Sequence, residues 1–115
     1  EALRVSAHLL IQRTGAITQY VDFDRRAWHA GVSLWRERDV CNDFSIGIEV
    51  EGTEDRPFEA VQYEALNRVL RCLYHTYPRL SPSTVAGHEV IAPGRKWDPG
   101  PFFDWTRIGI SGGRL

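Results

Sequence analysis

Three side chains able to take part in hydrolysis lie in one short stretch that is broken by proline and glycine. His88, Lys96 and Asp98 fall within residues 87–101, which read GHEVIAPGRKWDPGP. Such a run cannot continue far as a helix or a regular strand, so the three residues lie in or beside a loop. Neutral imidazole and carboxylate are both zinc ligands, and an ammonium can stabilise an oxyanion that develops beside a metal. The stretch therefore predicts a zinc site at His88 and Asp98, with a surface Lys–Asp pair as the alternative.

A fourth candidate, Glu49, lies in the segment FSIGIEVEG, residues 44–52. Alternation of side chains predicts a strand in which the even-numbered residues from Phe44 to Val50, all apolar, share one face. The glycine and the polar side chains at the odd positions share the opposite face. Glu49 points to this opposite face. A carboxylate at a strand end is a candidate general base for activating water, and an ordinary solvated glutamate is the alternative.

The elements that must position these residues follow from the hydrophobic periodicity. Alternation with a central RTGA turn predicts a β-hairpin over residues 3–23, and three- and four-residue spacing predicts the main helix over 59–77. Residues 24–43 show no clean period and are expected to form a long loop. The fold class is α/β, with a mixed sheet flanked by helices. The remaining expectations are a short strand over 83–88 and a final helical turn within 101–108.

Length and composition limit the possible functions. The 115 residues suit a single domain, residues 1–115, in which 109–115 form a loose tail. A net charge of −1 gives no basic surplus for nucleic acid or for an anionic membrane, and no apolar run reaches membrane-spanning length. The two cysteines, Cys41 and Cys72, are expected to be small buried hydrophobes in a reducing compartment.

The long loop and the first strand carry further polar candidates. Trp28 beside His29 suits a contact with a sugar or a peptide, and packing of Trp28 in the core is the alternative. Arg36 and Arg38 could meet a peptide carboxylate. His8 alternates onto the polar face of the first strand.

Four motifs together resemble a known family. VSAHLLIQRTGAITQYV, RAWHAGVS, CNDFSIGIEVEGT and GHEVIAPGRKWDPGPFFDW look like the zinc N-acetylmuramoyl-L-alanine amidases of the AmpD type, in unbroken order from Leu3 to Trp105. The resemblance implies an amidase/peptidoglycan-recognition-like fold and a cytoplasmic enzyme of peptidoglycan recycling. It also implies an anhydromuropeptide substrate, cleaved between the lactyl group of 1,6-anhydro-N-acetylmuramic acid and L-alanine.

The resemblance assigns roles residue by residue. His88 matches the second zinc ligand of the family, and Asp98 matches the third. Glu49 matches the catalytic glutamate, and Lys96 matches the lysine that supports the tetrahedral intermediate.

The chain departs from the family pattern in one respect. The first zinc ligand of the family is a histidine on an N-terminal strand that precedes VSAH, and this chain lacks that segment. His8 belongs to the following motif and does not match the ligand. Removing the strand would also remove a wall, so an open pocket beside His88 and Asp98 is expected, and the hairpin should present an unpaired edge or an exposed apolar face. The alternative function is a muropeptide-binding module that lacks catalysis because its metal site is incomplete.

Overall fold

The protein is described from a computed structural model. The description covers residues 7–24, 34–35, 38–39, 45–53, 56–91 and 98–110.

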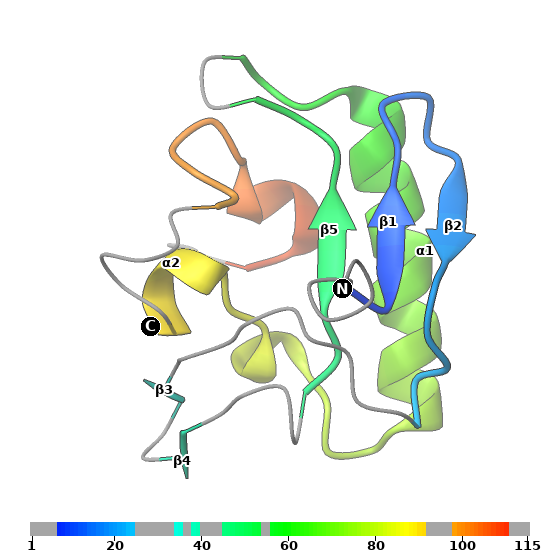
Figure 1. The fold of residues 1–115 in the computed structure, drawn as a ribbon, viewed down its shortest axis with the longest axis vertical. Coiled ribbons are helices and arrows are strands. Elements are labelled where there is room, and N and C mark those ends of the chain that lie inside the picture. Colours follow the sequence, from blue (N-terminus) through cyan, green and yellow to red (C-terminus); the bar gives the residue numbers. More distant parts are fainter. Residues whose placement is uncertain are drawn as a thin grey trace.

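A mixed three-stranded sheet forms the centre of the described fold (Figure 1). The central strand, β1 (Leu9–Ile11), pairs antiparallel with β2 (Ile17–Gln19) and parallel with β5 (Ile48–Val50). The predicted hairpin and the predicted third strand are thereby confirmed, although each regular strand is only three residues long. The parallel register places Leu10 opposite Glu49, so these two side chains leave the sheet on the same face.

The main helix, α1 (Ala60–Thr76), packs against the other face of the sheet (Figure 1). It ends at Thr76, with Tyr77 as its C-cap just before Pro78, within one residue of the predicted end. Its buried side chains recur at helical spacing and form one stripe. The members of this stripe are Gln62, Tyr63, Ala65, Leu66, Leu70 and Leu73.

The hydrophobic core joins the sheet, α1 and the C-terminal segment. Ile11 is fully buried, and the phenyl ring of Phe103 packs edge-on against Phe58 at 5.5 Å between ring centroids. Ile108 and Ile110 are also buried in this cluster. The loose tail expected from residue 109 is therefore wrong for Ile110, because its side chain has an apolar site to fill. Residues 111–115 lie outside the described ranges.

The smaller elements correct one prediction and confirm another. Residues 83–88 are not a strand: a 3-10 helix, η3 (Pro82–Thr84), is followed by an irregular stretch and then by one turn of helix, α2 (His88–Ile91). Pro82 has no amide hydrogen to donate to a ladder and suits the first position of a helix. The expected final turn is present as a second 3-10 helix, η4 (Trp105–Ile108).

Part of the expected long loop is also more regular than predicted. Two short strands within it, β3 (Leu34–Trp35) and β4 (Arg38–Asp39), pair antiparallel. Their four residues are too few to give a periodic signal in the sequence.

Two side chains lie in the opposite environment to the one predicted. His8 is completely buried, whereas its alternation had placed it on a polar face. Cys72 is exposed on α1, because it follows the buried position 70 by two residues and so leaves the apolar stripe. Cys41 lies outside the described residues.

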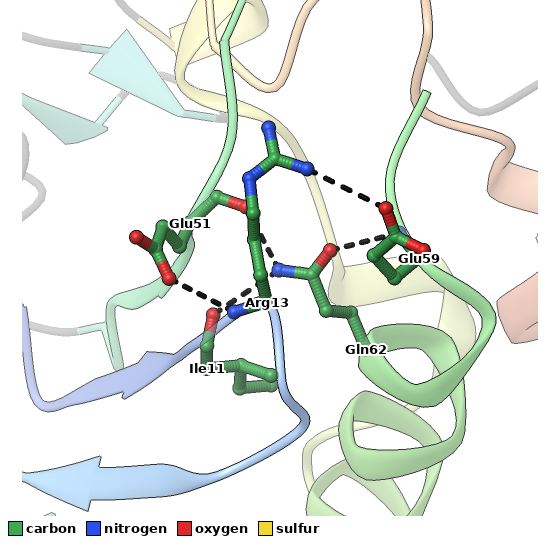
Figure 2. Close-up of polar contacts among 5 residues, drawn as sticks. All are labelled: Ile11, Arg13, Glu51, Glu59 and Gln62. Carbon is green, nitrogen blue, oxygen red and sulfur yellow. Dashed lines mark hydrogen bonds and ion pairs between the residues drawn. The ribbon is translucent and has the colours of Figure 1, made fainter. Parts of the chain in front are cut away.

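A polar cluster joins the ends of β1 and β5 to the start of α1 (Figure 2). The buried side-chain amide of Gln62 donates to the carbonyl oxygen of Glu51 at 2.8 Å and accepts from the amide of Glu59, also at 2.8 Å. The backbone amide of Arg13 donates to the Glu51 carboxylate at 2.9 Å. The Arg13 guanidinium lies 3.7 Å from the Glu59 carboxylate. The side-chain amide of Gln62 also lies 3.4 Å from the carbonyl oxygen of Ile11, so this one side chain ties the helix start to both strands.

Replacing Gln62 by methionine is expected to lower the free energy of unfolding by about 1–3 kcal/mol. Methionine keeps the shape but leaves the carbonyl of Glu51 and the amide of Glu59 unpaired in a partly buried place. Urea unfolding followed by circular dichroism measures the loss. The matched control is Gln12→Met, at an exposed position, which should change stability by less than about 0.5 kcal/mol. Equal stability of the two variants would contradict the role given to Gln62.

Candidate active site

His88 and Asp98 lie side by side although ten positions separate them in the chain. The ring nitrogen Nδ1 of His88 is 2.7 Å from Oδ2 of Asp98, within hydrogen-bond distance. His88 begins α2 and is nearly buried, with 9% of its side chain exposed, whereas 48% of the Asp98 side chain is exposed. The pair therefore combines a buried imidazole with a solvent-accessible carboxylate at hydrogen-bond distance from each other.

Gly87 explains how the two segments come so close. A Cβ atom at this position would lie 2.7 Å from Cδ of Pro99 and 3.4 Å from the carbonyl oxygen of Asp98. Contacts near 2.7 Å are too short for carbon atoms, so any larger residue would push the two segments apart. Gly87 is a residue of the site that the sequence analysis did not single out. Its signal was weak, because nothing in the sequence shows that Pro99 packs against it.

Glu49 reaches the same site from the sheet. It lies on β5 with an exposed side chain, on the face opposite to α1, as its alternation predicts. A cavity of about 730 Å³ is lined by Glu49, His88 and Asp98 together. Two of the three groups are carboxylates and one is an imidazole, so the cavity combines a possible general base with possible metal ligands.

The rest of the cavity wall is mostly apolar and extends to the core. It includes Leu66, Leu70 and Phe103. Among the described strands, β5 pairs only with β1, and β2 likewise has one unpaired edge. The cavity lies beside His88 and Asp98, and the expectation that it opens where a preceding strand would pack stays a prediction.

Tyr74 is a polar group in this apolar wall. Its hydroxyl oxygen is buried and has no hydrogen-bond partner within the described part of the chain. Burial raises the pKa of the Tyr74 hydroxyl, because the phenolate would lose its hydration. The hydroxyl is therefore neutral at physiological pH and is able to donate a hydrogen bond.

The other predicted site residues cannot be placed. Lys96, Trp28 and His29 lie outside the described residues. Arg38 belongs to β4, and its side chain is not described. Within the described ranges, no group of three histidine, cysteine or acidic side chains gathers as a metal site would require.

The chain is similar to amidases of bacterial cell-wall metabolism. Residues 1–101 match the family described as N-acetylmuramoyl-L-alanine amidase. The 1,6-anhydro-N-acetylmuramyl-L-alanine amidase AmpD of Escherichia coli K12 is 56% identical over 108 residues, which cover 94% of this chain and 58% of that protein. The chain thus spans little more than half the length of the curated relatives that it matches. These findings agree with the resemblance drawn from the four motifs.

Solved structures show the same relationship. The crystal structure of a selenomethionine derivative of AmpD superposes with a TM-score of 0.87 at 55% identity, covering 90% of this chain and 57% of that one. The amidase AmiD of E. coli, in complex with anhydro-N-acetylmuramic acid-L-Ala-D-γ-Glu-L-Lys, gives a TM-score of 0.83 at 37% identity, covering 91% and 47%. The α/β fold with a mixed sheet is therefore that of the AmpD and AmiD amidases. In the described part of this chain, no helix combines the length and the apolar character needed to cross a bilayer.

Proposed function

Because the chain belongs to the N-acetylmuramoyl-L-alanine amidase family, we propose that the full-length protein is a zinc amidase acting on anhydromuropeptides. It hydrolyses the amide bond between anhydro-N-acetylmuramic acid and L-alanine. The observation that supports this proposal best is that Glu49 and the hydrogen-bonded His88–Asp98 pair line the same cavity. A single amidase domain, a place in peptidoglycan recycling and a cytoplasmic location are part of the same proposal, and they rest on the family resemblance.

The donor atoms of His88 and Asp98 suit zinc. Two ligands of a tetrahedral zinc ion, with bonds of about 2.0–2.1 Å, stand roughly 3.3 Å apart. The 2.7 Å between Nδ1 and Oδ2 is a hydrogen-bond distance, so a small outward movement of the exposed Asp98 carboxylate would accommodate the ion. We infer that a third ligand comes from outside the described residues, since the resemblance places a histidine on a strand that precedes residue 3.

Each protein group then has a chemical task. Zinc, when bound, would polarise the scissile carbonyl and lower the pKa of a water molecule. The Glu49 carboxylate accepts the proton of the attacking water and passes it to the departing amine of L-alanine. Lys96, which matches the family lysine, holds the oxyanion that forms on the carbonyl oxygen.

The proposed substrate class rests on similar proteins. AmiD was solved with an anhydromuramyl peptide, and AmpD is named for the 1,6-anhydro-N-acetylmuramyl-L-alanine bond. The cavity of about 730 Å³ is within the usual range for small-molecule sites. Trp28, His29 and Arg38 remain candidates for contacts with the sugar and the stem peptide.

A muropeptide-binding module without catalysis is the second candidate. It is favoured by one observation, since the described residues supply two ligands and not three. The two functions differ in zinc content and in turnover.

The full-length protein should release L-alanyl peptide from anhydro-N-acetylmuramyl tripeptide and should carry one zinc ion per chain. Liquid chromatography with mass spectrometry measures the product, and elemental analysis measures the metal. Chelator treatment should abolish turnover, and added zinc should restore it. Tight binding of the muropeptide with no product and no zinc would overturn the amidase in favour of the binding module.

A further inference from the structure

We propose that His8 is a positioning residue for Glu49, acting through the backbone of Gly47. The inference deepens the proposed function, because it concerns the group that would act as general base. His8 is not among the residues that line the cavity, so it would act without touching the substrate. It lies directly before β1, at the point where β1 and β5 begin to pair.

His8 holds Gly47 from two sides. The backbone amide of Gly47 donates to the ring nitrogen Nδ1 of His8 at 3.0 Å. In return, the backbone amide of His8 donates to the carbonyl oxygen of Gly47 at 2.8 Å. One histidine therefore satisfies both the donor and the acceptor of a buried glycine two residues before Glu49.

The ring of His8 is fixed in one position and in one tautomer. It is completely buried and lies against Phe23, with 6.1 Å between ring centroids. Nδ1 is the ring nitrogen that accepts the hydrogen bond from Gly47, so it carries no hydrogen in this arrangement. A hydrogen bond in such a dry place is strong, and an amide left without its acceptor there costs free energy. The buried ring is thus a firm attachment for Gly47.

The backbone of β5 positions Glu49: the strand pairs with β1, with Leu10 opposite Glu49, and it is anchored near both ends. The Glu49 side chain is exposed, so packing does not hold the carboxylate in place. The strand β5 has only three residues and is tied at its far end by the hydrogen bond from Gln62 to the carbonyl of Glu51. His8 provides the corresponding tie at the near end. A shift of β5 would change the distance from Glu49 to His88, and misplacement by about 1 Å can reduce a rate by roughly 10²-fold.

The test compares two substitutions of His8 in the full-length protein. In His8→Asn the amide oxygen takes the position of Nδ1 and can still accept from Gly47, whereas His8→Leu has no acceptor. The leucine variant should lose about 10-fold or more in kcat with little change in KM, and the asparagine variant should recover most of the loss. Hydrogen exchange at the Gly47 amide should quicken in His8→Leu and stay slow in His8→Asn. Zinc content should be the same in both. If the leucine variant does not fold, His8→Gln, whose oxygen lies one carbon further out, takes its place.

A double-mutant cycle separates positioning from general damage. In a Glu49→Gln background, His8→Leu should change the residual rate by less than about 2-fold, because there is no base left to misplace. An equal loss in both backgrounds, or unchanged kcat in His8→Leu, would overturn the proposal. An inactive wild-type protein would instead count against the proposed function, and hydrogen exchange at Gly47 would still decide whether His8 holds this glycine.

Discussion

Replacing His88 by alanine is expected to remove zinc from the full-length protein and to reduce amidase turnover to background. The imidazole is nearly buried and cannot be replaced by another described histidine, since His8 is held by Gly47 and His75 lies exposed on α1. A catalytic zinc site has only three protein ligands, so losing one leaves too few to retain the ion. Elemental analysis after gel filtration measures zinc per chain. The matched control, His75→Ala, should retain full zinc content and activity.

Asp98→Asn distinguishes two ways in which the His88–Asp98 pair could serve the metal. If the carboxylate binds zinc directly, as proposed, the asparagine variant should lose zinc to the same extent as His88→Ala. If Asp98 only accepts the hydrogen bond from Nδ1, the expected fall in zinc affinity is about 10- to 100-fold. Competition with a chelator of known affinity measures the difference. The smaller effect would remove Asp98 from the set of direct ligands.

The sequence was most informative where a feature depends on local periodicity. The alternation around Glu49 predicted both its strand and its face, because successive side chains of a strand point to opposite sides whatever surrounds them. The spacing of Leu66, Leu70 and Leu73 predicted α1 for the same reason. The proline-rich loop between His88 and Asp98 predicted that the two side chains lie close together. The distance from Nδ1 of His88 to Oδ2 of Asp98 is 2.7 Å.

Features that depend on contacts between distant segments could not be predicted in this way. Alternation placed His8 on the side opposite to Leu9, but it could not show that this side is covered there. The close packing of Gly87 against Pro99 is a contact between two segments that are distant in the sequence, and no local pattern predicts it. Ile110 likewise fills a core site that the Gly-rich sequence after it concealed. The ligand roles of His88 and Asp98 came from the resemblance and remain proposals.

Glu49→Gln is expected to lower kcat by about 10²–10⁴ while leaving the zinc content unchanged. Glutamine keeps the size of the side chain and its place on β5, but its amide cannot accept the proton of the attacking water. His88 and Asp98 form their pair without Glu49, so the proposed ligands should be unaffected. Steady-state kinetics on anhydro-N-acetylmuramyl tripeptide, with zinc measured on the same sample, gives both quantities. KM should change little, because the lost interaction belongs to proton transfer and not to binding.

The matched control for this variant is Glu51→Gln, two residues further along the same segment. Its amide oxygen can still accept the hydrogen bond from the backbone of Arg13, and its carbonyl still accepts from Gln62. Glu51→Gln should therefore keep kcat within about 3-fold of the wild-type value, because exposed substitutions away from a site have small effects. A Glu49→Gln enzyme with near-normal kcat would exclude Glu49 as the general base. A fall in both kcat and zinc content would instead make Glu49 part of the metal site, since only a group that holds the ion affects both.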